Sequence, residues 1–211
     1  MFNRLREDIE CVKERDPAAR SFLEILFLYP GLKAVRLHRK ANFFYRHKMY
    51  FIARWISQYC SKKTGIEIHP AAQIGKKLFI DHGTGVVVGE TTIIGDNVTI
   101  YQGATLGGTG KETGKRHPTI GNNVMIGSGS KVLGPVVVGD NSKIAAGAVV
   151  LHDIPANCTA VGVPARVVKV EGVRVDDLDQ IDIPDPVAQE ISRLESEIED
   201  LKKLIAKGEE K

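Results

Sequence analysis

The most regular feature of the sequence is an aliphatic residue that recurs at every sixth position from residue 66 to about 170. Most of these residues are followed by a small residue or a turn former. A period of six fits neither an α-helix nor an alternating strand, whereas a fixed short period is typical of a solenoid. The pattern predicts that each hexapeptide forms a short strand and a turn and that three hexapeptides close a triangular coil. The aliphatic side chains stacked inside the coils are Ile68, Ile74, Ile80, Val88, Ile94, Ile100, Leu106, Ile120, Ile126, Val132, Val138, Ile144 and Val150.

The repeat is interrupted twice. Eight residues instead of six lead from Ile80 to Val88, and fourteen lead from Leu106 to Ile120. Interruptions of a solenoid form surface excursions, often on the binding face. The first holds the run Asp-His-Gly-Thr-Gly at 81–85, and the second holds Gly-Gly-Thr-Gly-Lys at 107–111 and Arg-His-Pro at 116–118. Ionisable side chains therefore fall where the regular scaffold is broken.

Residues 1–64 carry helical signals. Asp16 before Pro17 predicts a helix start, and the run Tyr-Pro-Gly at 29–31 predicts a break. A second amphipathic run follows, and we interpret its large apolar residues as a buried packing face. These residues are Phe44, Phe51, Ile52, Trp55 and Ile56.

The last 36 residues, from about residue 176, predict a helix that starts at Asp185-Pro186 and carries a short heptad seam. The seam residues alternate between spacings of four and three and are Val187, Ile191, Leu194, Ile198, Leu201 and Ile205. The sequence thus divides into a helical region (1–64), a solenoid (65–175) and a tail (176–211).

Composition narrows the class of protein. The chain has 211 residues and a net charge of +3, too small to indicate nucleic-acid binding. Cys11, Cys60 and Cys158 lie far apart without a Cys-x-x-Cys pair, so we expect neither a disulfide framework nor a zinc knuckle but a reducing, cytoplasmic location. No secretory signal is evident, and the most apolar stretch, 49–59, is too short to cross a bilayer, so we expect no membrane partner.

The interruptions carry the candidate chemistry. His82, oriented by a carboxylate such as Asp81 or Glu67, would serve as a general base for a hydroxyl group. No serine or cysteine has an obvious base beside it, which favours direct attack by the acceptor over a covalent acyl-enzyme. Arg116 beside His117 suits a carboxylate, and acids suit an ammonium group, so an amino acid is a fitting substrate. The glycine-rich loop lacks the spacing of a P-loop or a dinucleotide fingerprint.

Six motifs together resemble bacterial serine O-acetyltransferases, over about residues 15–166. They are Glu67–Gly75, Asp81–Gly85, Val88–Thr91, Thr105–Gly110, Arg116–Pro118 and Gly162–Arg166. The resemblance implies a mainly β, α+β protein in which a left-handed parallel β-helix follows an N-terminal helical region and precedes a C-terminal helix. It implies transfer of acetyl from acetyl-CoA to the L-serine hydroxyl, giving O-acetylserine for cysteine biosynthesis. It also implies L-cysteine as feedback inhibitor and no required metal.

The resemblance also implies roles for individual residues. His82 matches the general base and Glu67 the acid that orients it. Asp16 and Asp81 match the acids that hold the substrate ammonium, and Arg116 with His117 matches the carboxylate-binding pair. The positions that match coenzyme A contacts are Gly108, Thr109, Ser128, Lys143 and Ala146.

The chain departs from the family in three places. Glu67 stands where aspartate is common, which adds one methylene to the side chain that orients the base. The N-terminal region is short, so we expect a homotrimer and not a hexamer, with the three tails bundled or packed back on the body. The final residues, Gly-Glu-Glu-Lys at 208–211, lack the isoleucine that inserts into O-acetylserine sulfhydrylase, which argues against that complex.

Three alternatives remain open from the sequence. A hexapeptide-repeat acetyltransferase of a sugar or another small hydroxyl acceptor would share the repeat and the cofactor. A β-helical zinc carbonic anhydrase would need three histidines at one metal, for which His69, His82, His117 and His152 are available. A non-catalytic scaffold would have no need of ionisable groups in both interruptions.

Overall fold

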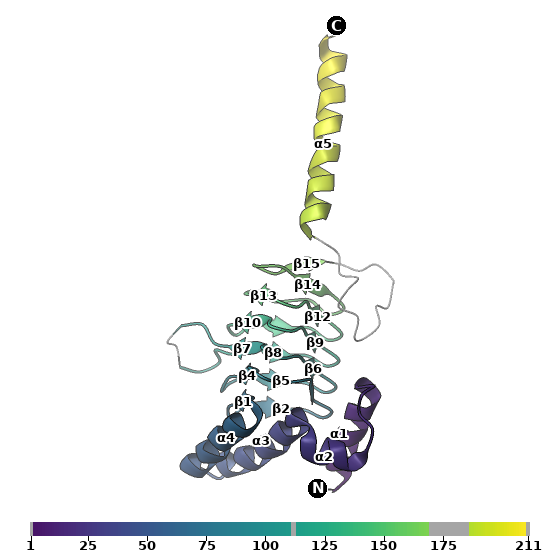
Figure 1. Cartoon of the computed structure of the whole chain (residues 1–211). Helices are drawn as coiled ribbons and strands as arrows, with labels where there is room; N and C mark the ends of the chain where they lie inside the picture. Colours follow the sequence, from purple (N-terminus) through teal and green to yellow (C-terminus); the bar gives the residue numbers. More distant parts are fainter. Residues whose placement is uncertain (1, 111–112, 169–185, 210–211) are drawn as a thin grey trace.

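A computed structural model describes residues 2–110, 113–168 and 186–209 (Figure 1). Four helices precede the solenoid: α1 (Phe2–Arg15), α2 (Phe22–Leu28), α3 (Pro30–Arg46) and α4 (Tyr50–Thr64). A fifth, α5 (Pro186–Glu209), follows it. Figure 1 shows α1–α4 at the first coil of the solenoid and α5 beyond its other end. No helix within the described residues is both long and apolar enough to span a membrane.

The solenoid consists of strands of two or three residues. They are β1 (Glu67–Ile68), β2 (Gln73–Ile74), β3 (Phe79–Ile80), β4 (Val87–Val88), β5 (Ile93–Ile94), β6 (Thr99–Ile100), β7 (Thr105–Gly107), β8 (Thr119–Ile120), β9 (Met125–Ile126), β10 (Lys131–Leu133), β11 (Val137–Val138), β12 (Lys143–Ile144), β13 (Val149–Val150), β14 (Thr159–Val161) and β15 (Arg166–Val168).

Successive strands turn through three flat faces. Sheet A has the order β1-β4-β7-β10-β13, sheet B the order β11-β8-β5-β2, and sheet C the order β15-β14-β12-β9-β6-β3. Up to β13 the strands follow one another through A, B and C in turn, and neighbours within a sheet are parallel. The fold is a left-handed parallel β-helix, as predicted.

The core of the β-helix is the predicted aliphatic stack. Ile68 lies opposite Val88, and Val88 lies opposite Leu106, so equivalent positions of successive coils are in contact. All thirteen stack residues are buried except Ile74, which is partly buried. The period of six is therefore confirmed by the register and by the burial.

An asparagine ladder runs along the corner between sheets B and C. Asn97, Asn123, Asn141 and Asn157 all have positive φ, between 55° and 63°, a region that asparagine tolerates better than most residues. Their side-chain amides donate from each coil to the next, over 2.7 Å from Asn97 to Asn123 and 3.0 Å at the two later steps. Arg15 of α1 contacts the first rung at Asn97 and also donates to Thr99 Oγ1 over 2.9 Å. The first helix thus caps the ladder.

The last coil is closed by residues 154–168. The backbone of Ile154 bonds to β11, and the carbonyl of Gly162 and the amide of Ala165 bond to β13. β15 turns back antiparallel to β14 on sheet C. The final strand of each face therefore has backbone partners from this closing segment.

The predicted helix start at Asp16-Pro17 is wrong. α1 ends at Arg15, and the next helix begins at Phe22, where the Ser21 hydroxyl accepts the Glu24 amide over 3.2 Å. The Asp16 carboxylate instead accepts the Ala18 amide over 2.8 Å in a turn. The cap and proline pattern is local, and Asp16 satisfies it without a helix following.

The buried aromatic face expected after residue 44 is wrong in part. The run divides into α3 and α4, and Phe51 is 84% exposed and Trp55 65% exposed. α4 packs instead through its small residues, Ala53, Ser57, Cys60 and Thr64. Small side chains allow close approach of the helix to its neighbours, so the aromatic side chains lie on the opposite face.

The tail contains a helix that begins at Pro186, as predicted. Its seam residues Ile191, Leu194, Ile198 and Leu201 are 44–58% exposed in the single chain. The side chains of Val187 and Ile205, and the predicted boundary at 175–176, lie outside the described residues.

Candidate active site

One group of predicted site residues lies at the corner that follows β3. Asp81 and His82 form this corner, and His82 Nε2 is 4.0 Å from Asp81 Oδ2. His82 has a φ of 53°, and its side chain is 77% exposed. A basic imidazole beside a carboxylate, open to an incoming substrate, is an arrangement suited to proton transfer.

Asp16 reaches the same corner through Tyr29. The Tyr29 hydroxyl donates to Asp16 Oδ2 over 2.6 Å. Burial of the phenol, the hydrogen bond to Asp16 and the negative charges of Asp16 and Asp81 all raise the pKa of Tyr29, so it stays a neutral donor. The structure therefore brings together Asp16, Asp81 and His82, three of the predicted residues.

A second group lies at the corner between sheets A and B, where the loop after β7 returns to β8. Arg116 Nη2 contacts Glu90 Oε2 at 2.5 Å. The Thr91 hydroxyl accepts the backbone amides of Arg116 and His117 over 3.0 and 3.1 Å. Glu90 and Thr91 thus fix the returning loop and orient the Arg116 guanidinium group.

The contacts of His117 define its tautomer. Its Nδ1 accepts the Thr91 amide over 3.2 Å, which leaves the proton of the neutral ring on Nε2. Burial, followed by the charge of Arg116, lowers the pKa of His117, so the ring is neutral at pH 7. The ring lies against two glycines, because a Cβ at Gly89 would be 1.9 Å from its Cδ2 and a Cβ at Gly108 would be 3.3 Å from its Nε2. His117 is therefore a fixed N–H donor.

Glu67 lies on the outer side of sheet A, between the two corners. Its carboxylate is 3.5 Å from Arg54 Nη2 of α4. Among the described contacts, no hydrogen bond or ion pair joins Glu67 to His82. The pairing of Glu67 with the general base stays a prediction.

Four of the five candidate coenzyme A residues lie at the same two edges of the β-helix, and the fifth, Lys143, does not. Gly108 and Thr109 lie in the loop after β7, beside His117. Ser128 and Ala146 follow β9 and β12 at the corner between sheets C and A, where the Gly147 amide donates to the Ser128 carbonyl. Lys143 begins β12 on sheet C.

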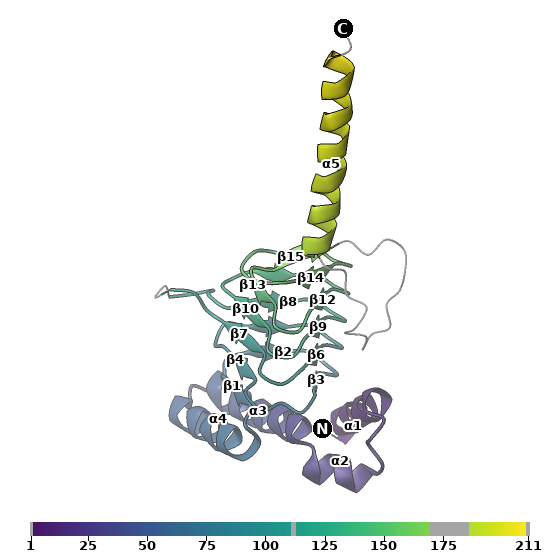
Figure 2. The same cartoon turned by 45° about the horizontal axis from the view of Figure 1, so that its top comes forward.

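The two corners are separated by one side of the triangular coil. A run of five or six extended residues spans about 15–20 Å. Figure 2 shows β1, β4 and β7 stacked as one face of the solenoid. Serine is far shorter than this span, so one serine cannot touch both corners of a single chain.

Sequence reasoning gave no role to Tyr29, Glu90 or Thr91. Glu90 and Thr91 lie in the motif Val88–Thr91, just after a strand ends. A polar pair at that position could have indicated a site residue. Tyr29 was interpreted only as part of a helix break. Nothing local in the sequence places its hydroxyl at Asp16, because the contact depends on how α1 and α2 pack.

Within the described part of the chain, no three histidine, cysteine, aspartate or glutamate side chains are arranged to hold a metal ion. His69 and His117 lie near each other, and burial lowers the pKa of both.

Comparison with known proteins identifies the family. Residues 117–152 match the family described as bacterial transferase hexapeptide (six repeats). A serine acetyltransferase of Bacillus subtilis is 56% identical over 202 residues, covering 95% of this chain and 93% of the relative. A serine acetyltransferase of Brucella abortus solved with coenzyme A is 46% identical with a TM-score of 0.78, over 81% of this chain and 68% of that one. A serine acetyltransferase solved with cysteine is 40% identical with a TM-score of 0.82, over 86% of this chain and 72% of that one.

The aligned region covers nearly the whole chain, and the two corners at which the charged side chains gather lie inside it. On this evidence the chain belongs to the serine acetyltransferase family.

Proposed function

We propose that the chain transfers acetyl from acetyl-CoA to the hydroxyl of L-serine by direct attack, with His82 as general base. The observation that carries the proposal is the division of the charged groups into an acidic corner and a donor corner. Asp16 and Asp81 suit the ammonium group of an amino acid, and Arg116 with His117 suits its carboxylate. A sugar acceptor, the first alternative, would need neither charge.

In the proposed reaction one proton moves from the serine hydroxyl to His82 and then to the leaving thiolate. His82 takes the proton of the serine hydroxyl as its oxygen attacks the thioester carbon of acetyl-CoA. The carbon–sulfur bond then breaks, and the imidazolium returns the proton to the leaving thiolate. Glu67, one methylene longer than the aspartate common in the family, orients the imidazole from the outer side of sheet A. The glycine-rich loop at Gly108 and Thr109 brings backbone amides to the thioester, while Ser128, Lys143 and Ala146 line the path of the coenzyme.

A panel of hydroxyl acceptors tests the substrate directly. Purified chain is mixed with acetyl-CoA, and released thiol is measured with L-serine, L-threonine, L-homoserine and neutral sugars. We expect L-serine to give the highest kcat/KM. A sugar that exceeds L-serine would overturn the proposal in favour of the alternative acetyltransferase.

L-cysteine should compete with L-serine. The two amino acids differ only by sulfur for oxygen, so the same ammonium and carboxylate contacts suit either one. The solved relative with bound cysteine supports this expectation. Inhibition kinetics at several serine concentrations provide the measurement, and inhibition that saturating serine cannot relieve would contradict a shared site.

Arg116→Lys should raise the Michaelis constant for serine by about 10- to 100-fold, the equivalent of a lost charge-assisted hydrogen bond. Lysine cannot reproduce a planar fork that contacts Glu90 and a carboxylate together. The constant for acetyl-CoA should change little. Arg193→Lys is the matched control, because Arg193 also pairs with glutamates, at 190 and 197, but lies on α5. Equal effects on both Michaelis constants would indicate a structural role for Arg116.

The separation of the two corners supports a homotrimer. If both corners hold one serine, the acidic corner of one chain must face the donor corner of another. A closed ring of three chains satisfies this for every chain, because each triangular coil offers both edges of sheet A. The exposed seam of α5 then meets two equivalent seams, and we expect the three tails to bundle.

Light scattering distinguishes the role of the body from that of the tail. The full chain and a chain truncated after Val175 should both be trimers. The order of isoleucine and leucine along the seam would favour a two-stranded coiled coil in an isolated helix. The seam has fewer than three heptads, however, and is too short to outweigh the β-helix interface. A monomer after truncation would mean that α5 holds the assembly together, and a hexamer would contradict the expected trimer.

We place the enzyme in the cytoplasm. Cys11, Cys60 and Cys158 are free and buried, as expected of a protein that folds under reducing conditions.

A further inference from the structure

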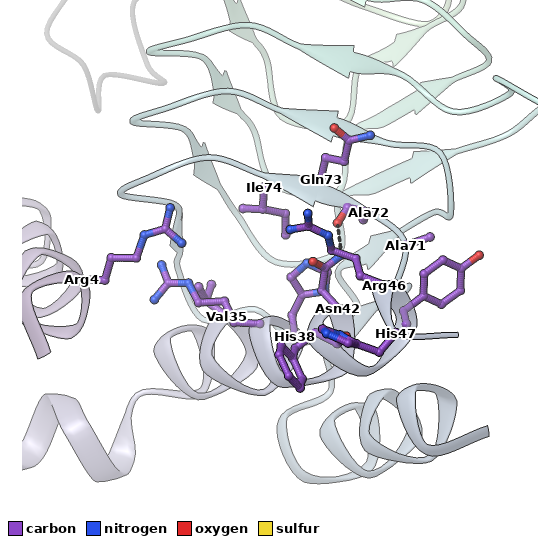
Figure 3. Close-up of a pocket in the computed structure, with 13 residues that line it drawn as sticks. Arg4, Val35, His38, Asn42, Arg46, His47, Ala71, Ala72, Gln73 and Ile74 are labelled. Carbon is purple, nitrogen blue, oxygen red and sulfur yellow. Dashed lines mark hydrogen bonds between the residues drawn. The ribbon is translucent and has the colours of Figure 1, made fainter. Parts of the chain in front are cut away.

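A groove of about 960 Å³ lies between α3 and the first coil, and its lining residues include none of those placed at the two corners above (Figure 3). Its segment 71–72 lies on the edge between sheets A and B, one coil before Glu90 and Thr91. One wall is α3, with His38, Arg39, Asn42 and Arg46, and the other is the segment 71–74 that includes β2. Arg4 of α1 lies at one end of the groove. The volume is within the range of small-molecule sites in proteins.

The groove is positively charged. Arg4, Arg39 and Arg46 line it, and its 13 lining residues include no aspartate or glutamate. Arg39 is held by the buried carboxylate of Asp8, with Nη2 2.9 Å from Oδ1, and its remaining N–H groups are not used in this pair. Arg4 and Arg46 make no ion pair among the described residues, so no carboxylate in that part of the chain neutralises their charges.

A buried histidine in the groove has an unsatisfied atom. His38 is 5% exposed, and its Nδ1 has no hydrogen-bond partner in the described part of the chain. Burial lowers the pKa of His38 to about 4, so the ring is neutral. The other ring nitrogen donates its proton to the Ala72 carbonyl, and Nδ1 is therefore a hydrogen-bond acceptor. Buried polar atoms without partners are rare in proteins and call for an explanation, of which a ligand is one.

We propose that this groove binds a small metabolite that carries phosphate or carboxylate groups. Arg4 and Arg46 reach toward the groove from its two ends in Figure 3, and guanidinium groups bind both oxyanions through paired hydrogen bonds. A hydroxyl or a protonated oxygen on the same ligand donates a hydrogen bond to His38 Nδ1. The atom is buried, so this contact requires a rotamer change of the side chains around it, which is common on binding. Val35, Phe43 and Ile74 supply an apolar wall for the rest of the ligand.

The site does not depend on the proposed acetyl transfer, so binding is measured without turnover. Isothermal titration of the full chain at low salt uses pyrophosphate in one arm and citrate in the other, each with and without saturating coenzyme A. We expect saturable binding of at least one anion at one site per chain, unchanged by coenzyme A. Tighter binding of pyrophosphate assigns a phosphorylated ligand, and tighter binding of citrate assigns a carboxylate.

Three substitutions localise the binding. Arg4→Gln and Arg46→Gln should each weaken it about tenfold, the equivalent of one charge-assisted contact. Lys40→Gln is the matched control, because Lys40 is an exposed cation of α3 outside the groove, and it should leave binding unchanged. The His38 ring signals in a nitrogen–proton NMR correlation should shift on addition of the anion.

Several outcomes would overturn the proposal. One is that neither anion binds saturably, and another is that Lys40→Gln weakens binding as much as the two arginine substitutions do. A third is that coenzyme A abolishes binding of the anion. The last result would place the anion in the coenzyme site. An unchanged His38 signal at saturation would also exclude this groove as the location.

Discussion

His82→Ala should lower kcat by about 10²- to 10⁴-fold, which corresponds to about 3–5 kcal/mol of activation free energy. The substitution removes the imidazole that takes the hydroxyl proton, and the other ionisable side chains placed at this corner are Asp16, Asp81 and Tyr29. The side chain is 77% exposed, so its loss should not change the free energy of unfolding. Steady-state thiol release gives kcat, and titration with coenzyme A should give an unaltered dissociation constant.

The matched control is His152→Ala, because His152 is also exposed but lies on a coil without predicted catalytic residues. It should retain the parent kcat. A His82→Ala enzyme with near-normal turnover would show that another group takes the proton. A parallel loss of coenzyme A binding would assign His82 to binding the coenzyme.

Ile126→Ala should lower the free energy of unfolding by about 2–5 kcal/mol, the range measured for large-to-small substitutions in protein cores. Ile126 is fully buried and lies opposite Ile100 on one side and Ile144 on the other. Hydrogen bonds fix the spacing of the coils, so neighbouring coils cannot move together to fill the cavity. Urea unfolding at a fixed protein concentration provides the measurement.

Ile126→Val at the same position is the graded control and should cost about 0.5–1.5 kcal/mol. Val167→Ala provides a surface comparison, because Val167 is 43% exposed on β15. A cost at Ile126 no greater than at Val167 would contradict the stacked core as the main source of stability.

The β-helix could be predicted from the sequence because its determinant is repeated. Each coil places aliphatic side chains in the same environment, so all thirteen stack residues indicate the same period. The interruptions were visible for the same reason, as departures from a regular background. His82 and Arg116 lie within these interruptions, so the sequence alone predicts them as site residues.

The helical region was harder to predict, because its structure depends on contacts between distant segments. Asp16 has the sequence of a helix cap, yet its carboxylate is used by Tyr29 and by a turn. Trp55 has the spacing of a packing residue, yet α4 packs through the small residues of its other face. Nor could the sequence show that the two charged corners lie a whole side of the coil apart within one chain.

The position of α1–α4 at the first coil sets the order in which the coils can form during translation. These helices are synthesised before the solenoid and can cover its first coil before the later coils exist. Each later coil pairs with the open strand edges of the coil before it, so the coils can be added in the order of translation. Until residues 154–168 are made, every intermediate length leaves unpaired strand edges of the kind that promote aggregation. Synthesis of this closing segment therefore ends the period during which the nascent chain is exposed to misassembly.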